Sequence, residues 1–353
     1  MKPANQTYNQ LKTVTNKLRR GVLATISGFS LNRAKLLLRY LWYNKIKKKI
    51  IPQVITIGVT NSCQCRCVHC SSNVPKLKQS LKEKEMTTWQ IKDLIDQTVM
   101  IGIPRITFFG GEPLLRKDIF ELIRYANSKG LITRINTNGL ALSEKVVLKL
   151  KNAGLSHCDV SIDDSNPEIH DELRGVPGLF EKVIKGIELL KKHKMLCQIV
   201  TYAGKRNVTA GLERTIDLGR KLQVTSVSIV FPMATGCWFE SFDELLNKEE
   251  REKVRNLADA SFVHIEIPTS KHRCNVIKQA SLYVSPEGNV SPCAFIPWSF
   301  GNIKNHKLYK LVNSFYSEYN IDHQGDCLMN DYYTRDMLRK TIEKVSANNS
   351  QKL

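Results

Sequence analysis

The feature that most constrains this 353-residue chain is a short loop with closely spaced cysteines, residues 60–72. Cys63, Cys67 and Cys70 follow one another with the spacing C-x3-C-x2-C. Three thiolates can hold an iron-sulfur cluster and leave one iron without a protein ligand, whereas electron-transfer proteins usually close a cluster with four cysteines. The loop therefore predicts an open iron at which a substrate or cofactor binds. A fourth cysteine, Cys65, lies inside the loop. The same spacing started at Cys65 would require a cysteine at position 69, which is His69, so we interpret Cys65 as a bystander.

Further motifs follow the loop in a fixed order. They are Gly-Gly-Glu-Pro at 110–113, Asn-Thr-Asn-Gly at 136–139, Ser-Ile-Asp at 161–163, His-Asp at 170–171 and Arg-Gly at 174–175. Over residues 54–232 this series resembles the radical S-adenosylmethionine (SAM) superfamily. The resemblance implies a 4Fe-4S cluster on the three cysteines, whose open iron chelates SAM. It also implies that an electron, supplied by a donor such as flavodoxin or ferredoxin, cleaves SAM to a 5'-deoxyadenosyl radical that abstracts hydrogen from a substrate.

The resemblance also implies which residues contact SAM. We expect these to be His69, Gly110, Gly111, Glu112, Pro113, Asn136, Ser161 and Arg174. Glycines at a strand end let a ligand approach the backbone closely. Arg174 is the candidate for the SAM carboxylate, because a guanidinium binds that group with two parallel hydrogen bonds, and Glu112 is either a carboxylate partner or a brace for the loop. The sequence departs from the family at His69, where an aromatic residue is usual, and at Asp164, where glycine is usual.

A zinc site is the alternative for the cysteine loop, because C-x2-C pairs also bind zinc. A structural zinc site takes four ligands that often arrive as two pairs. Here the motif stands alone after an apolar run, residues 54–59, that is typical of a buried strand. The iron-sulfur interpretation is therefore favoured.

The arrangement of apolar runs predicts an α/β fold. Six predicted strands, near residues 54–60, 105–109, 132–136, 158–162, 197–201 and 226–231, are separated by amphipathic segments such as 88–101, 117–129, 143–153 and 179–192. Alternating strands and helices indicate a parallel sheet. Six units are fewer than the eight of a closed barrel, and the resemblance implies a partial (β/α)6 TIM-type barrel. Ligands of such folds bind at the carboxyl ends of the strands, where the motifs fall.

A second set of cysteines follows residue 265. Cys274, Cys293 and Cys327 surround a Pro-Glu-Gly-Asn turn at 286–289. The spacing C-x13-G-x4-C resembles the hairpin of SPASM and twitch domains, which implies a small α+β cap with a second, auxiliary 4Fe-4S cluster. Three cysteines leave this cluster one ligand short, so Asp326, Asp331 or the substrate completes it; the alternative is that the three are ordinary buried cysteines. Cys158, Cys197 and Cys237 are assigned to that ordinary class.

The net charge of +20 is concentrated at the start of the chain. The first fifty residues contain twelve Lys or Arg and no Asp or Glu. Within them, residues 30–43 predict a basic helix rich in Leu, Tyr and Trp. Four roles are open for such a helix. It can lie on an anionic membrane surface, pack on the barrel, bind RNA, or bind an acidic peptide or protein. Nucleic acid is not a favoured partner, because charge alone supports only nonspecific attraction.

We expect four segments: a basic extension (1–50), a radical SAM core (51–265), a SPASM/twitch-like domain (266–340) and a tail (341–353). Ten cysteines indicate a reducing compartment, so we expect a cytoplasmic protein, peripheral at the membrane if residues 17–50 contact lipid. The predicted substrate is a peptide or a cofactor precursor. The alternatives are a membrane lipid or isoprenoid and, in another class, an electron carrier or scaffold without SAM chemistry.

Overall fold

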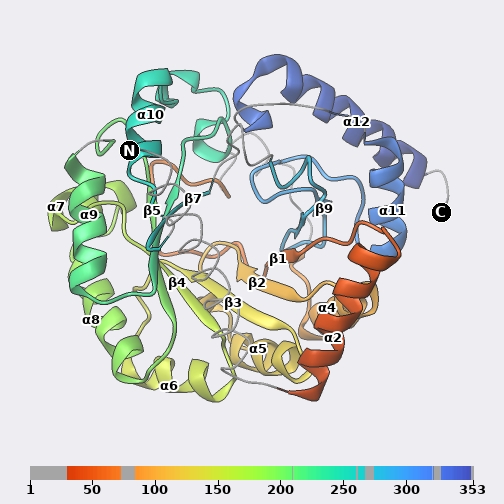
Figure 1. Cartoon of the computed structure of the whole chain (residues 1–353), viewed down its shortest axis with the longest axis horizontal. Helices are drawn as coiled ribbons and strands as arrows, with labels where there is room; N and C mark the ends of the chain where they lie inside the picture. Colours follow the sequence, from red (N-terminus) through yellow and green to blue (C-terminus); the bar gives the residue numbers. More distant parts are fainter. Residues whose placement is uncertain are drawn as a thin grey trace, which may run out of the picture.

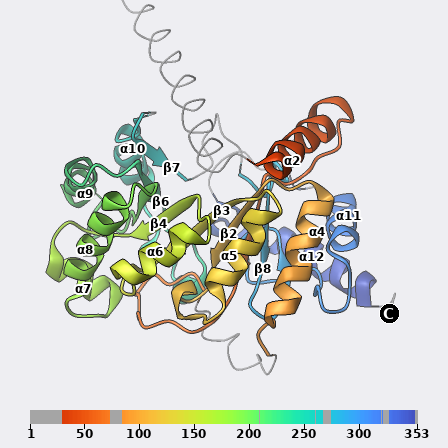
Figure 2. The same ribbon diagram turned by 90° about the horizontal axis from the view of Figure 1, so that it is seen from below.

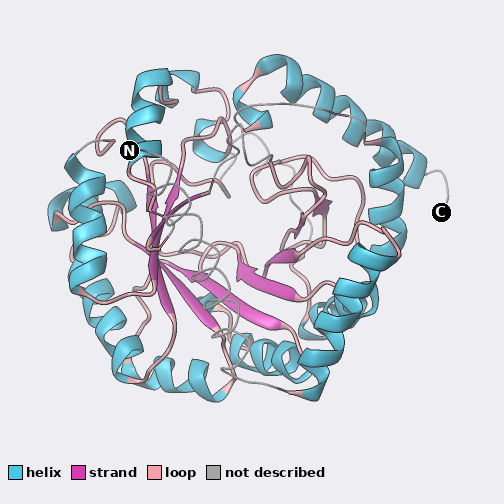
Figure 3. Ribbon diagram, viewed as in Figure 1, coloured by secondary structure: helices cyan, strands magenta, loops and turns pink. Residues whose placement is uncertain are grey.

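The computed structural model describes residues 30–72, 84–208, 210–259, 261–266, 274–319, 321 and 327–350. Figure 1 shows the sheet in the interior and the helices around its outer side, and Figure 3 separates the two classes of element by colour. Residues 1–29 of the basic extension lie outside these ranges, as do residues 73–83, which follow the cysteine loop.

The sheet has nine strands in the order β7-β6-β5-β4-β3-β2-β1-β8-β9. Neighbouring strands from β7 to β8 are parallel, and only β8 and β9 are antiparallel. The bounds are β1 (Val54–Gly58), β2 (Arg105–Phe109), β3 (Ile132–Thr137), β4 (His157–Ser161), β5 (Cys197–Tyr202), β6 (Ser226–Val230), β7 (Val263–Ile265), β8 (Ser281–Val284) and β9 (Val290–Ser291). The sheet is an open, partial barrel, as predicted.

Ten α-helices are described, and most of them connect consecutive strands. Their bounds are α2 (Leu31–Leu41), α4 (Thr88–Ile101), α5 (Ile119–Ser128), α6 (Glu144–Asn152), α7 (Pro167–Arg174), α8 (Leu179–Lys192), α9 (Ala210–Lys221), α10 (Lys248–Asn256), α11 (Leu308–Glu318) and α12 (Tyr332–Ser350). Helix α4 begins with a capping box, in which Thr87 and Gln90 each accept a backbone hydrogen bond from the other, and it ends at Gly102 in the left-handed conformation. Each of the described helices is too short or too polar to cross a bilayer.

The C-terminal part departs from the expected arrangement in two ways. The predicted hairpin forms, but β8 pairs in parallel with β1, so this part extends the main sheet. Residues 341–350, expected as a tail, belong to α12, where Ile342 and Val345 are buried. The sequence pattern missed this because few apolar residues mark the buried side of α12. The boundary at residue 266 stays a prediction.

The basic helix predicted near residues 30–43 forms as α2, followed by a π-helical turn, η1 (Trp42–Ile46). Ser30 Oγ caps α2 by accepting a hydrogen bond from the Arg33 backbone amide (3.2 Å). Arg33 and Leu36 are buried against the barrel. The helix crosses close to Gly130, where a Cβ atom would lie 2.5 Å from the backbone of Asn32. Packing on the barrel therefore accounts for one side of α2.

Two glycines bring the end of β2 against the cysteine loop. Gly111 donates a backbone hydrogen bond to Thr60 O (2.7 Å), and Gly110 has a φ of +138°, which favours glycine. A Cβ atom on Gly111 would lie 2.3 Å from Ser62 O, which is a backbone atom without freedom to move aside. The close approach fixes the position of the loop relative to the sheet.

We predict that Gly111→Ala displaces the loop. Overpacking at a rigid contact costs about 1–3 kcal/mol, so urea unfolding should show this loss, and iron bound after anaerobic reconstitution should fall. Gly204→Ala is the matched control, because its added Cβ would meet nothing nearer than 3.7 Å. Equal iron content in the two variants would contradict the role of Gly111.

Candidate active site

A cavity of about 730 Å³ lies at the carboxyl ends of the central strands. Its wall contains the three cysteines of the loop and most of the residues expected around SAM. These are Cys63, Cys67, His69, Cys70, Gly110, Gly111, Asn136, Ser161 and Arg174. The carboxyl ends of parallel strands meet at one edge of the sheet. This geometry brings motifs that are far apart in the sequence into one cavity.

The thiols of the loop have the chemistry of metal ligands. A hydrogen bond from the Cys65 thiol lowers the pKa of Cys63 to about 6 and that of Cys67 to about 7. Asn138 Nδ2 lies 3.8 Å from Cys63 Sγ, and Arg174 Nη1 lies 3.7 Å from Cys67 Sγ. The thiolate is the form that binds metal, so these partners favour the ligand form of the sulfurs. The site fits a cluster, and Cys65, interpreted as a bystander, lowers the pKa of the thiols on both sides of it.

The geometry gives no support to the zinc alternative. A single zinc ion holds each thiolate sulfur at about 2.3 Å, which requires the ligands to converge tightly. In the described part of the chain, no three side chains of His, Cys, Asp or Glu converge in this way.

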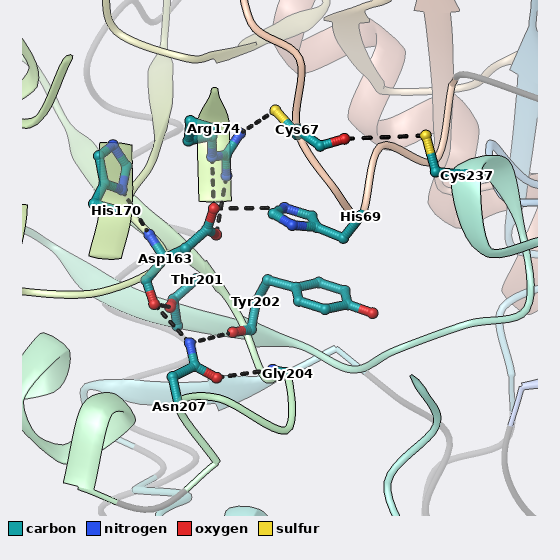
Figure 4. A network of polar contacts seen from close by, with 10 residues as sticks. All are labelled: Cys67, His69, Asp163, His170, Arg174, Thr201, Tyr202, Gly204, Asn207 and Cys237. Carbon is teal, nitrogen blue, oxygen red and sulfur yellow. Dashed lines mark hydrogen bonds and ion pairs between the residues drawn. The ribbon is translucent and has the colours of Figure 1, made fainter. Parts of the chain in front are cut away.

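A buried ion pair between Arg174 and Asp163 lies beside the cysteine loop. Figure 4 shows the pair with its neighbours. Arg174 donates to both carboxylate oxygens of Asp163, from Nε to Oδ2 (2.6 Å) and from Nη2 to Oδ1 (3.0 Å). Its remaining nitrogen, Nη1, points at Cys67 Sγ. Burial alone would raise the pKa of Asp163, but the charge of Arg174 outweighs it and lowers that pKa to about 2. Both groups are therefore charged at neutral pH.

The same helix end also holds the loop through its backbone. The amide of Arg66 donates to Arg174 O (2.9 Å), and that of Val68 donates to Leu173 O (3.1 Å). Gly175 ends α7 in the left-handed conformation. A Cβ atom at this position would lie 3.1 Å from the backbone oxygen of Arg66. Helix α7 thus positions both the backbone of the loop and the charge beside its middle cysteine.

His69 lies between the ion pair and an aromatic wall. Its ring stacks on Tyr202 with centroids 4.4 Å apart and planes at 10°, and Trp238 meets it edge-on at 6.3 Å. Burial lowers the pKa of His69 to about 4, so the ring is neutral when its Nε2 contacts Asp163 Oδ2 (3.4 Å). One face of His69 is already covered by Tyr202.

Comparisons with known proteins agree with this geometry. Residues 57–219 match the family model described as Radical SAM superfamily, and residues 274–331 match SPASM, an iron-sulfur cluster-binding domain. The chain is 32% identical to the AdoMet-dependent heme synthase of Methanosarcina barkeri, over 72% of this chain and 80% of that protein. The chain belongs to the radical SAM superfamily. The Fe-coproporphyrin III synthase of the same organism is 30% identical, over 67% of this chain and 58% of that protein.

Solved structures of radical SAM enzymes share the fold. Native anSMEcpe with bound AdoMet and Cp18Cys peptide superposes with a TM-score of 0.60 at 15% identity, over 86% of this chain and 100% of that one. Streptococcus suis SuiB bound to the precursor peptide SuiA gives 0.60 at 16% identity, over 76% of this chain and 66% of that one. At this level of identity, the likeness shows the fold alone.

Membership settles the class of protein and its cofactors. The chain is a radical SAM enzyme, with a 4Fe-4S cluster and SAM at the main site and an auxiliary iron-sulfur site in the SPASM region. The alternative of an electron carrier or scaffold is set aside.

The structure narrows the expected role of Arg174 in this radical SAM enzyme. Two of its N–H groups, one on Nε and one on Nη2, already bind Asp163. Nη1 is directed towards Cys67, and the second N–H group of Nη2 is not used by Asp163. Direct binding of the SAM carboxylate by Arg174 stays a prediction, restricted to the Nη1 and Nη2 side of the guanidinium.

Glu112 braces the loop that the resemblance placed around SAM. Its carboxylate accepts hydrogen bonds from the backbone amides of Asn138 (2.7 Å) and Leu114 (3.1 Å) and from Thr137 Oγ1 (2.8 Å). Burial raises its pKa to about 7. Glu112 and Pro113 do not belong to the cavity wall, unlike Gly110 and Gly111. The structure therefore favours the brace over the SAM contact for Glu112.

Asn136 and Ser161 do face the cavity at the ends of β3 and β4. Asn136 Oδ1 is buried without a hydrogen-bond partner among the described residues. A buried unpaired acceptor is costly, and a donor on a ligand in the cavity would relieve that cost. This observation fits the expected contact with SAM.

The auxiliary cysteines lie in the part of the chain that extends the sheet beyond β1. Burial, with a smaller contribution from nearby Cys274, raises the pKa of the Cys293 thiol to about 12, so a cluster must displace protons on binding. None of these three cysteines forms a disulfide, which leaves their sulfurs able to bind a cluster. Asp331 Oδ1 accepts from the backbone amide of Thr334 (2.8 Å) near the start of α12, and Asp326 lies outside the described residues. The fourth ligand stays open between these residues and the substrate.

Several residues of the site were not predicted as such, and three of them show why. Asp163 and Tyr202 end up beside the cluster loop, and Cys237, assigned to the ordinary cysteines, lines the cavity and donates its backbone amide to Cys70 O (2.9 Å). An aromatic residue at the carboxyl end of β5 was a usable signal for Tyr202. Cys237 had no such signal, whereas Cys158 and Cys197 are buried in the core, as expected.

We predict that Arg174→Gln makes the SAM-site cluster harder to reduce. A cation that donates a hydrogen bond to a ligand sulfur stabilises the reduced, more negative cluster. Losing about 1.4 kcal/mol of this preference corresponds to about 60 mV in a one-electron couple, so the midpoint potential from an anaerobic redox titration monitored by EPR should fall by that order. Arg206→Gln, which removes an exposed ion pair with Glu172, is the control. An unchanged potential in Arg174→Gln would show that Arg174 only holds the loop.

We also predict a pH effect from His170. Burial lowers its pKa to about 4, and its Nδ1 accepts a hydrogen bond from the Asp163 amide (3.2 Å), which requires the neutral ring. The unfolded chain binds this proton at a higher pH than the folded one, so stability is lost as the pH falls from about 6.5 towards 4. The free energy of unfolding is measured with urea between pH 6.5 and 5. His170→Gln should make its increase with pH less steep, by up to about 1.4 kcal/mol per pH unit. His306→Gln, outside this network, should leave the slope as it is.

Proposed function

We propose that this radical SAM enzyme abstracts hydrogen from a cofactor precursor of the tetrapyrrole class. The observation that carries the proposal is the 32% identity with an AdoMet-dependent heme synthase, over most of both chains, in a protein whose cavity is built around the open cluster loop. Two further heme synthases, from Oleidesulfovibrio alaskensis and Nitratidesulfovibrio vulgaris, are 28% and 26% identical over 72% of this chain. The peptide-modifying neighbours share the fold alone, so they give the peptide alternative less support.

The lining of the cavity suits a planar, partly apolar substrate. The cluster, SAM and the substrate share the cavity of about 730 Å³, so the side chains that line it, rather than its volume, indicate the class of substrate. Phe109, Tyr202 and Phe295 contribute aromatic surface to its wall, and aromatic faces stack on planar rings. Arg66 also lines the cavity, and none of the described carboxylates pairs with it. Its guanidinium suits an acidic side chain of the substrate.

When bound, SAM supplies a 5'-deoxyadenosyl radical that removes a hydrogen atom from the substrate. The residues of the chain prepare that event by position and charge. Asp163 and Arg174 hold the middle of the cysteine loop and place a cation beside it. Glu112, which follows β2, accepts hydrogen bonds from Thr137 and Asn138 at the end of β3 and so holds the two strand ends together. The stacked rings of His69 and Tyr202 give the cavity a rigid wall that a substrate does not have to order.

A membrane lipid or isoprenoid is less suited as the substrate. Helix α2, the element that favoured this alternative, contacts the end of α5 and the turn before β3, at the amino ends of the strands. The cavity lies at their carboxyl ends. Lipid held by α2 would therefore meet the wrong edge of the sheet.

The electron donor is part of the proposal. A small acidic protein such as flavodoxin or ferredoxin suits a chain with a net charge of +20, since opposite charges speed encounter. None of the ten cysteines forms a disulfide, which suits the chemistry of two clusters, and a reducing, cytoplasmic setting is proposed for this reason.

The test is anaerobic turnover of the reconstituted protein with SAM and dithionite. Iron coproporphyrin III, the metal-free porphyrin and an unrelated peptide are compared, and 5'-deoxyadenosine is measured against a reaction without substrate. We expect only the tetrapyrroles to raise the yield, and Arg66→Gln to raise KM about tenfold or more with little change in kcat, because a bidentate charged contact is worth about 1.5–3 kcal/mol. Deuterium from a labelled tetrapyrrole should appear in the 5'-deoxyadenosine.

Two variants separate the outcomes. A Cys63/Cys67/Cys70 triple alanine variant should lose about four of about eight irons and all SAM cleavage, because only the main cluster is removed. Cleavage in the wild type that no tetrapyrrole stimulates would overturn the substrate class and leave the radical SAM chemistry standing. Stimulation by the peptide alone would favour peptide maturation.

A further inference from the structure

Helix α2 and the turn η1 have one side fixed on the barrel. Arg33, almost fully buried, donates from Nη2 to Asn127 Oδ1 (2.9 Å) and to Leu131 O (3.4 Å). Asn32 Nδ2 donates to Ser128 O (2.9 Å). After the turn, Ile51 donates its amide to Asn44 Oδ1 (3.2 Å) and is itself buried. These contacts hold the helix in one orientation, so the direction of its other side is also fixed.

That other side is apolar and exposed. Large apolar side chains there are between 49% and 68% exposed, namely Leu31, Leu38, Leu41, Trp42, Ile46 and Ile50. Single exposed apolar residues are ordinary, but a contiguous group marks an interaction surface. We call this group the α2 face. None of the described residues covers it.

The charge around the α2 face is of one sign. Lys35, Arg39 and Lys45 lie on the same helical segment, and residues 47–49 are all lysine. The first fifty residues contain no acidic side chain. The charge of Lys47 lies 6.0 Å from the ring centre of Trp42, and that of Arg39 lies 5.7 Å from Tyr43. Long basic side chains that border aromatic and aliphatic groups suit the boundary between lipid headgroups and acyl chains.

We propose that the α2 face binds the surface of an anionic membrane and that the cavity then faces away from the lipid. Exposed apolar side chains by themselves could bind any apolar surface of a partner. Apolar side chains bordered only by cations complement a bilayer with negative headgroups. Figure 2 shows α2 as a projecting element at one end of the sheet, and it contacts the segment before β3, whereas the cavity lies where the strands end. The substrate therefore enters from the aqueous side while the enzyme is held at the membrane.

The first test uses the full chain with reconstituted clusters and co-sedimentation with vesicles. Phosphatidylcholine vesicles are compared with vesicles that also contain phosphatidylglycerol, at low and high salt. We expect binding to the anionic vesicles only, weakened by salt. Neutralising Lys45, Lys47, Lys48 and Lys49 to Gln should weaken binding at least about tenfold, because each basic residue near the surface contributes.

A matched pair of variants tests the apolar part. Leu38→Ser/Trp42→Ser/Ile46→Ser should abolish vesicle binding and leave SAM cleavage unchanged. Trp89→Ser/Met100→Ser/Tyr309→Ser removes equally exposed apolar side chains elsewhere and should bind as the wild type does. Equal loss in both variants, or no binding by the wild type, would overturn the proposal. So would wild-type self-association, measured by light scattering, that the α2 triple variant abolishes, because the face would then bind a second copy.

The orientation has its own readout. Brominated lipids quench only tryptophans that enter the bilayer, so the quenching should be lost in Trp42→Phe and persist in Trp298→Phe. Quenching that persists in Trp42→Phe would place another face of the enzyme on the lipid and overturn the proposed orientation.

Discussion

The buried ion pair between Asp163 and Arg174 is the contact on which the active site depends. It joins the end of β4 to the end of α7 and leaves one guanidinium nitrogen directed at Cys67. A buried charge without its partner costs several kcal/mol, so each residue requires the other. Two backbone hydrogen bonds from the cysteine loop to the same helix end make the loop follow this pair. The pair thus sets the geometry and the electrostatics around the cluster ligands together.

The open parallel sheet places the cavity and helix α2 at its two opposite edges. Carboxyl ends of strands gather the cysteine loop, the glycines after β2 and the aromatic wall into one cavity. Amino ends carry α2, with its buried arginine on one side and its exposed apolar side chains on the other. Because the strands run in one direction, the membrane contact proposed for α2 at one edge leaves the cavity at the other edge open to the substrate.

Local patterns predicted most of the elements of the fold. The six strands of the first part agree to within two residues, and α4 and α8 have the predicted bounds, because buried parallel strands and amphipathic helices leave strong periodic signals. The hairpin was predicted as well, but its parallel pairing with β1 was not, since no local pattern records which strand lies next to which. Residues 341–350 were missed because a polar helix buries only a narrow stripe.

The sequence by itself determined the chemistry: the spacing of Cys63, Cys67 and Cys70 and the order of the motifs identify a radical SAM site, since ligand type and spacing within one loop are local properties. Only the tertiary structure decided what each partner does. Arg174 pairs with Asp163, and Glu112 accepts hydrogen bonds that hold the loop. Cys237 and Tyr202 line the cavity. These assignments depend on contacts between residues far apart in the chain. Hydrogen-bonding capacity is finite, and which group satisfies a given arginine or carboxylate is settled only when the strands and helices pack together.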